Sequence, residues 1–382
     1  MHSPAVFSNI SSQNLQSQVI DFLRFPLIVC VVFIHNIAST VEIRGVEFGS
    51  NIYMPLFYYC TEFFRGPLAF RNQFFFFVSG FLFFGNIEKF GLLSYKNKLQ
   101  NRTLTLLVPY LFWNLAAFFF FYFMITFGFF SSPMSCNILK QFWCENIEKD
   151  GITTYPIAVQ FWYIRDLLVA VILTPIIYFF VKKMKIYGIV TLGILWYLNW
   201  WFEYIGGRGF SITCIFFFTA GAYFGINKRN LLNDFSEVKH LSFLLYPLLS
   251  LANLFTREEA FNPYIHNMNT IFGIIFIFNL TAILLKKGKI KVNRFLTTSS
   301  FFIYAVHVPF LSDNFKKLSF LLFKPEADLP ITALFFINVI LTVLTALGLY
   351  YILMRFCPKF TNVILGGRYN KERMKQKSFL IT

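Results

Sequence analysis

The first apolar segment of the chain carries three side chains that can do acid–base or anion chemistry. Asp21, Arg24 and His35 lie within an otherwise hydrophobic run that predicts a membrane helix. At about 100° per residue, the eleven steps from Arg24 to His35 return to within roughly 20° of the same helix face and cover about 16 Å along the axis. Asp21 lies one turn before Arg24, and Ser39 one turn after His35. The sequence therefore predicts a polar stripe that runs from one membrane surface well into the bilayer.

The imidazole of His35 is the first candidate catalytic group. Its unperturbed pKa of about 6.5 lets it take a proton from a hydroxyl near neutral pH. A packing histidine that bonds to a neighbouring helix explains this one segment equally well. Arg24 suits an anionic ligand that enters from the cytoplasm, but it can also pair with Asp21 or reach the lipid headgroups.

Five further residues whose side chains could bind substrate or take part in a reaction lie in or beside other apolar segments: Arg71, Trp162, Arg165, Asp166 and His307. A charged group near the middle of a membrane helix costs about 2.5–3.5 kcal/mol, so such groups usually face the bundle interior and mark a functional pathway. An interfacial charge pair is the alternative for Arg165 and Asp166. Gly80, after Ser79, allows close approach of a neighbouring helix.

His307 shares a helix face with Ser300 and Tyr304, because these residues follow the spacing i, i+4, i+7. It is a second imidazole in apolar surroundings. Arg102 lies at the expected cytoplasmic mouth of a later span, where it can bind an anion. Its simpler interpretation is a positive charge that only sets membrane orientation.

The composition is that of a membrane protein. Of 382 residues, 57% are hydrophobic and 14% are charged, whereas a soluble domain carries about 25% charged residues. The mean hydropathy is +0.59, and several continuous apolar runs reach the roughly 20 residues that cross a bilayer. We therefore expect an all-α polytopic membrane protein. The net charge of +16 lies in short clusters between apolar runs, which indicates membrane orientation and argues against a nucleic-acid partner.

The apolar runs predict about ten transmembrane helices. Their ranges are 20–40, 67–86, 104–130, 160–181, 186–204, 210–226, 241–255, 269–285, 296–313 and 331–355. With both termini in the cytoplasm, the inner loops carry more than twice as many Lys and Arg residues as the outer loops. The sequence thus predicts a multi-pass protein of the cytoplasmic (inner) membrane. The larger outer loops, 41–66 and 131–159, can form a rim around a cavity.

The chain divides into three expected parts. Residues 1–19 are a cytoplasmic segment, 20–355 the transmembrane domain, and 356–382 a basic cytoplasmic tail that lipid headgroups attract. The first segment contains no Lys or Arg, so we expect no cleavable signal peptide. The six cysteines form no metal motif, and no metal is expected. Cys136 and Cys144 share one outer loop, where they can pair or remain free thiols.

Five ordered stretches resemble the acyltransferase-3 family of integral membrane O-acyltransferases, especially bacterial members that O-acetylate surface glycans. They are IDFLRFPLIVCVVFIHN, with Arg24 and His35 at the R-x10-H spacing, then FFFFVSGFLFF, NRTLTLLVPYLFW, FWYIRDLL and SSFFIYAVHVPF. The resemblance covers about residues 20–355. Two positions depart from the family pattern. Arg102 matches the first arginine of an R-x-x-R pair, but Thr105 stands at the second, and Gln73 stands where a proline is usual.

The resemblance implies an enzyme that moves an acetyl or other acyl group to a sugar hydroxyl. The donor would be acetyl-CoA used from the cytoplasm, and the acceptor a cell-surface or lipid-linked glycan. Arg24 and Arg102 would hold the CoA phosphates, and His35 would act as general base or as a transient acyl carrier. Trp162, Arg165, Asp166, His307 and Arg71 would contact the sugar.

The sequence leaves a rival function from another class. A transporter that flips a lipid-linked sugar, or exports an acylated metabolite, also needs intramembrane charges. Helices broken by glycine or proline in matching halves would favour it, and the sequence contains no convincing pair. A non-catalytic relative is the third alternative, and retention of both Arg24 and His35 argues against it.

Overall fold

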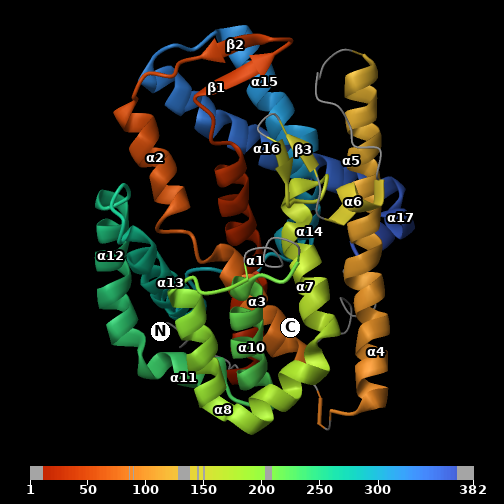
Figure 1. Ribbon diagram of the computed structural model, residues 1–382, viewed down its shortest axis with the longest axis vertical. Coiled ribbons are helices and arrows are strands. Elements are labelled where there is room, and N and C mark those ends of the chain that lie inside the picture. The colour runs from red at the N-terminus through yellow and green to blue at the C-terminus, as the bar shows by residue number, and fades with distance from the viewer. Residues whose placement is uncertain are drawn as a thin grey trace, which may run out of the picture.

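The computed structural model describes residues 12–85, 87–88, 90–127, 138–143, 146–148, 151–202 and 209–367. These residues form a helical bundle with two small antiparallel hairpins (Figure 1). Five helices are long and apolar enough to cross a membrane, or seven if each of two bent pairs counts as one span. The predicted class, an all-α membrane protein, is confirmed.

The elements follow the chain in a simple order. The helices are α1 (Ser12–His35), α2 (Pro55–Arg65), α3 (Arg71–Gly85), α4 (Leu92–Arg102), η1 (Thr103–Leu107), α5 (Val108–Thr126), α6 (Ile138–Trp143), η2 (Val159–Phe161), α7 (Trp162–Ile172), α8 (Thr174–Tyr197), α10 (Ile212–Ile226), α11 (Leu231–Glu237), α12 (Lys239–Phe255), α13 (Asn262–Lys286), α14 (Arg294–Val306), η3 (His307–Leu311), α15 (Ser312–Phe323), α16 (Asp328–Phe356) and α17 (Pro358–Ile364). The strands are β1 (Thr40–Ile43), β2 (Val46–Gly49), β3 (Asn146–Glu148) and β4 (Gly151–Thr153).

The described helices do not reproduce the predicted count of ten spans. Helices α3 and α10 have 15 residues each, fewer than the roughly 20 that cross a bilayer unaided. Helix α8 consists of two helices that meet across a kink at Lys185, whose backbone is non-helical (φ 49°, ψ −132°), and this break falls between the predicted spans 160–181 and 186–204. Helices α7 and α8 meet at 66°, and α11 and α12 at 70°. These are bends within single candidate spans and are not shown to occupy matching halves of the chain, so the expectation about glycine- or proline-broken helix pairs stays a prediction. Ten spans and cytoplasmic termini stay predictions.

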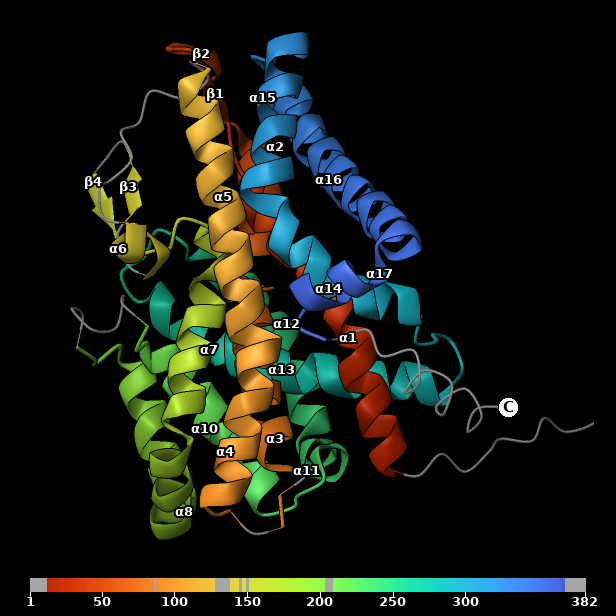
Figure 2. The same ribbon diagram turned by 90° about the vertical axis from the view of Figure 1, so that its right-hand side faces the viewer.

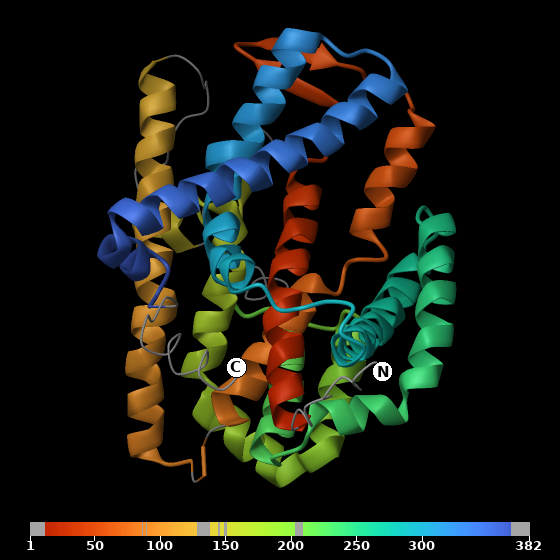
Figure 3. The same cartoon turned by 180° about the vertical axis from the view of Figure 1, so that it is seen from behind.

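Helix α1 lies at the centre of the bundle and contacts α3, α13, α14 and α16. Helix α16 crosses it obliquely (Figure 3). The rod formed by α4, η1 and α5 runs along the side of the bundle that faces the viewer in Figure 2. Helix α1 begins near the end where α8 and α11 lie, which we call the α8 end. It rises toward the end that carries β1, β2 and α2, which we call the hairpin end (Figure 1).

The most extensive helix pair is α3 with α10. Its closeness depends on glycine, because a Cβ atom on Gly80 would overlap the Phe218 carbonyl oxygen, and one on Gly221 would overlap the Phe77 carbonyl oxygen. Small residues allow such backbone contact between membrane helices. The predicted close approach at Gly80 is therefore confirmed.

We expect Gly80→Ala to destabilise the protein by more than the roughly 1–3 kcal/mol typical of core overpacking, because the added methyl meets backbone that must move as a helix. Gly85→Ala on the same helix is the matched control, since a Cβ there has no atom within 4 Å. Thermal unfolding in detergent measures both variants. Equal midpoints for the two would contradict the packing assigned to Gly80.

The hairpin end is ordered by local turn chemistry and by one carboxylate. Strands β1 and β2 pair around Arg44 and Gly45, whose φ angles of 52° and 81° suit a two-residue hairpin turn. Asp328, at the start of α16, accepts hydrogen bonds from the backbone N–H groups of Leu56 and Phe57 at 2.8 Å each. A carboxylate there satisfies the free N–H groups of α2 and fixes its position.

The predicted segment boundaries need two changes. Helix α1 begins at Ser12, so part of segment 1–19 continues the first membrane helix. The predicted tail 356–382 begins with α17, whose Ile364 carbonyl accepts a 3.1 Å hydrogen bond from the indole of Trp113 on α5. Residues 368–382 lie outside the described residues, as do Cys136 and Cys144.

Candidate active site

His35 and His307 meet inside the bundle although 272 positions separate them in the chain. Their ring centroids are 5.0 Å apart, with an angle of 66° between the ring planes. His35 is the last residue of α1, and His307 is the first residue of η3. The two histidines come from different predicted spans. The fold therefore joins the two imidazoles that the sequence singled out separately.

His307 lies where a membrane helix breaks. Helix α14 ends at Val306, η3 follows with a wider turn, and Val308 has a non-helical backbone (φ −127°, ψ 138°). Such π-type turns often occur at functional sites. The break leaves nearby carbonyls free, and Nδ1 of His307 lies 2.7 Å from the Tyr304 oxygen and 3.2 Å from the Ile303 oxygen.

These contacts determine the tautomer of His307. A carbonyl oxygen only accepts hydrogen bonds, so Nδ1 must carry the proton. Nε2 is then the basic nitrogen of the neutral ring. This atom is buried and has no hydrogen-bond partner within the described part of the chain. A buried polar atom without a partner costs about 1–3 kcal/mol, which favours a functional reason for its presence.

The end of α1 is fixed by polar groups from α15. Lys316 donates a 2.8 Å hydrogen bond from Nζ to the backbone oxygen of His35 and forms a 2.9 Å ion pair with Asp313. The buried side chain of Asn36 donates to Ser312 Oγ at 3.0 Å. These bonds satisfy carbonyl and side-chain groups at the helix terminus and hold the His35 backbone against the segment that carries His307.

A second set of bonds fixes the His307 segment. The buried side chain of Gln160 donates to the carbonyl oxygens of Ala305 at 3.0 Å and of Val308. The hydroxyl of Tyr304 donates to the Gln160 backbone oxygen. Gln160 lies in η2, the turn directly before α7, so this turn braces the helix break that positions His307.

Arg71 approaches the histidine pair from the start of α3. Its Nη1 donates to the Leu68 oxygen at 2.9 Å, while its Nε is buried without a partner among the described residues. The guanidinium is close enough to His35 for its charge to act on the imidazole. Of the residues predicted to contact the sugar, Arg71 and His307 are the two that the structure associates with His35.

Arg165 and Asp166 are instead bound within the fold. Both are buried, with 2% and 1% of the side chain exposed. Arg165 donates to Asp166 Oδ1 at 3.1 and 3.0 Å and to the carbonyl oxygens of Trp143 and Thr154. Asp166 Oδ2 accepts a 2.6 Å hydrogen bond from Ser211. Every nitrogen of the guanidinium is occupied, which favours a structural role for this pair.

Trp162, the first residue of α7, packs edge-on against Phe76 of α3, with ring centroids 6.2 Å apart.

Gln73, one of the two departures from the family pattern, has a buried Oε1 atom without a hydrogen-bond partner in the described chain. The buried hydroxyl of Thr105, the other departure, also has none there. Both departures therefore place an unpaired polar atom in the interior.

The two arginines predicted to hold the donor are not equivalent. Arg24 forms a 3.4 Å ion pair with Asp21, which was one of its predicted alternatives. Arg102 has no hydrogen bond or ion pair to any described residue, and its guanidinium lies 5.9 Å from the Phe83 ring centroid. Helices α1 and α4 do not form an extensive contact, so the structure does not join these two arginines.

Sequence reasoning missed Lys98 as a partner of Arg102. Its Nζ lies 5.6 Å from the centroid of the same Phe83 ring, and the two cations feel each other's charge. Lys228, two residues after the end of α10, lies near Lys98 and donates to the carbonyl oxygens of Gly85 and Ile87 at 2.8 and 2.6 Å. The signal was available, because Lys98 and Arg102 are four residues apart and share a helix face.

Comparison with known proteins assigns most of the chain to one family. The family model described as "Acyltransferase domain", of the acyltransferase-3 family, matches residues 18–356. No curated protein matches the chain, and no solved structure matches it. The match spans α1 to the end of α16 and includes both histidines. This multi-pass membrane protein therefore belongs to the acyltransferase-3 family and is a membrane acyltransferase.

Proposed function

We propose that this protein transfers an acetyl group from cytoplasmic acetyl-CoA to a sugar hydroxyl of a cell-surface or lipid-linked glycan, in the cytoplasmic membrane. The observation that carries the proposal is the contact between His35 and His307, with ring centroids 5.0 Å apart. Two imidazoles that share one site inside the bundle can accept and pass on a proton, and a sugar hydroxyl must lose its proton when it attacks a thioester.

In the proposed reaction, His35 removes the proton of the acceptor hydroxyl while the hydroxyl oxygen attacks the thioester carbonyl. A C–O ester bond forms, the C–S bond breaks, and the leaving CoA thiolate takes the proton. His307 supports His35, because carbonyl oxygens hold its Nδ1–H group and its Nε2 keeps an unused lone pair within the described part of the chain. Holding both substrates in one site supplies much of the rate. Transient acylation of His35 is the alternative path.

The α8 end suits the phosphate groups of the donor. Lys98 and Arg102 carry positive charges without a carboxylate partner in the described chain, and such groups bind phosphate through charge-assisted hydrogen bonds. From this end the long pantetheine arm would carry the thioester along the bundle toward His35. Arg24 would add charge at the same end when its pair with Asp21 opens.

Inverted membrane vesicles that carry the protein and its native glycan provide the direct test. Supplied with acetyl-CoA labelled in the acetyl group, they should transfer the label to glycan. Sugar movement without consumption of acetyl-CoA would instead support a transporter. Vesicles without the protein give the background.

We expect Arg102→Ala to raise the apparent KM for acetyl-CoA about tenfold with little change in kcat, because the side chain would contribute to donor binding rather than to chemistry. The double variant with Lys98→Ala should raise KM further. Lys96→Ala is the matched control, since this lysine is exposed on the same helix. An unchanged KM in the double variant would remove Lys98 and Arg102 from the donor site.

A further inference from the structure

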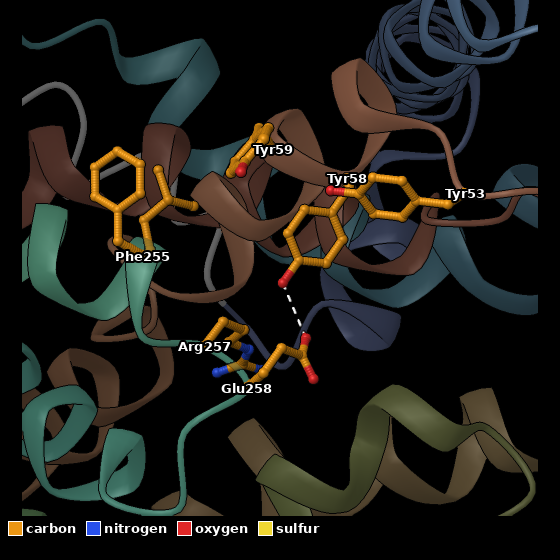
Figure 4. Close-up of a pocket in the computed structure, with 7 residues that line it drawn as sticks. Tyr53, Tyr58, Tyr59, Phe255, Arg257 and Glu258 are labelled. Atoms are coloured by element: carbon orange, nitrogen blue, oxygen red, sulfur yellow. Dashed lines mark hydrogen bonds between the residues drawn. The ribbon is translucent and has the colours of Figure 1, made fainter.

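Two hollows lie side by side at the hairpin end. The larger has a volume of about 590 Å³, and its lining begins at Ile37, two residues after His35, and continues along α2. The smaller, of about 470 Å³, lies between α2 and the end of α12 (Figure 4). Both volumes fall within the roughly 300–1,000 Å³ of small-molecule sites. Their linings share Tyr53, Tyr58, Arg257 and Glu258, so the two hollows form one continuous site.

The charges of this site compensate one another. Glu62 is 3% exposed, and its two oxygens pair with Arg65 at 2.9 Å and with Arg257 at 2.8 Å. Both arginines are partly exposed and keep further N–H donors for a ligand. With Glu258, the site contains two acids and two bases. A neutral ligand rich in hydroxyl groups fits this balance better than an anion does, since each group can donate to or accept from a hydroxyl.

Aromatic faces complete the polar lining. The rings of Tyr53 and Tyr58 lie 5.7 Å apart, and Tyr58 meets Tyr59 edge-on at 5.4 Å. Tyr58 donates a 2.9 Å hydrogen bond to Glu258 (Figure 4). Partial burial and this bond raise the pKa of Tyr58 to about 12, so the phenol remains a donor at neutral pH. Ring faces beside hydroxyl-bonding groups suit the apolar face and polar edge of a sugar ring.

The smaller hollow adjoins an exposed apolar surface. Phe255 lies in its wall and is 72% exposed. It continues a stripe of exposed side chains on α12 that comprises Leu244, Leu248 and Leu251, spaced as one helix face. In a membrane protein such a face contacts acyl chains. The continuous site therefore connects a lipid-facing surface, through Tyr58 and Glu258, to the end of α1 that carries His35.

We propose that the two hollows bind the acceptor as a lipid-linked sugar, with a neutral sugar ring in the larger hollow and the lipid carrier leaving through the smaller one. This inference rests on the proposed function and narrows its acceptor. Helix α2, which forms the common wall, is held by Asp328, so the site exists before the acceptor arrives. The acceptor enters sideways from the bilayer, while the donor enters from the α8 end.

The test uses the same vesicles and labelled acetyl-CoA, followed by extraction into chloroform and methanol. We expect the first labelled product in the organic phase. We expect Glu258→Gln and Tyr53→Ala each to slow transfer about tenfold at an unchanged KM for acetyl-CoA, with Tyr53→Phe recovering most of the rate because it keeps the ring. Glu259→Gln is the matched control, since this neighbouring carboxylate lines neither hollow.

The outcomes separate this inference from the function on which it rests. Label found only in water-soluble glycan, or wild-type rates for both Glu258→Gln and Tyr53→Ala, would overturn the lipid-linked acceptor site while leaving the acetyltransferase intact. Absence of transfer by the unaltered protein would overturn the proposed function and this inference together. Thermal midpoints of the variants in detergent, compared with that of Glu259→Gln, separate lost binding from lost folding.

Discussion

Replacing His35 by alanine is expected to slow acetyl transfer by a factor of about 10²–10⁴, which is the usual contribution of one general acid–base group. The partner ring of His307 lies 5.0 Å away between centroids and cannot replace a base that touches the acceptor hydroxyl. The labelled vesicle assay measures the rate, normalised to the amount of protein in the membrane. Transfer at the wild-type rate by His35→Ala at equal protein level would falsify the assignment.

His307→Ala is the informative comparison for His35. Its expected loss is smaller, because His307 acts through His35, and the bonds from Gln160 to the neighbouring carbonyls remain. An acid quench during turnover distinguishes the two roles left for His35. Label that stays on the protein and disappears in His35→Ala indicates an acyl carrier, whereas unlabelled protein indicates a general base.

Replacing Asp166 by alanine is expected to cost about 3–5 kcal/mol of stability, because it leaves the buried Arg165 guanidinium without its charged partner. The carboxylate accepts two hydrogen bonds from Arg165 and one from Ser211, and both ionic side chains are at most 2% exposed. Thermal unfolding in detergent measures this loss of stability. We expect the protein that remains folded to keep its KM.

Two further variants test whether Asp166 is structural or binds substrate. Ser211→Ala removes one hydrogen bond and should cost only about 1 kcal/mol. Arg165→Met combined with Asp166→Leu removes both charges and should recover much of the stability lost by Asp166→Ala. A stable Asp166→Ala protein with an impaired acceptor reaction would restore the substrate-contact role predicted from the sequence.

The sequence was most informative at ionisable side chains, because placing them in a membrane helix costs free energy. An acid, a base and an imidazole in an apolar run are rare enough that His35 and His307 could be singled out one at a time, and five ordered motifs predicted the family that the match over residues 18–356 confirms. Gly80 was interpretable for a related reason, because a small residue among phenylalanines has a packing meaning that holds in any membrane bundle.

The sequence could not predict the role of residues that depend on a partner far away in the chain. Arg165 and Asp166 looked like substrate ligands, yet the carbonyl oxygens of Trp143 and Thr154 complete the guanidinium's bonds. Glu62 lay in a predicted loop and became the buried centre of two ion pairs only because α2 folds against Arg257. No local pattern predicts that contact, since 195 positions separate the two residues.

The sequence by itself thus determined the class, the family and the two imidazoles, because hydropathy, charge placement and motif spacing are local properties of the chain. Only the tertiary structure decided that His35 meets His307, that Lys98 joins Arg102 on one phenylalanine ring, and that a site with balanced charges opens beside the end of α1. The physical reason is that helix bends, glycine contacts and one capping carboxylate set the relative positions of the helices, and each of these acts between segments far apart in the chain.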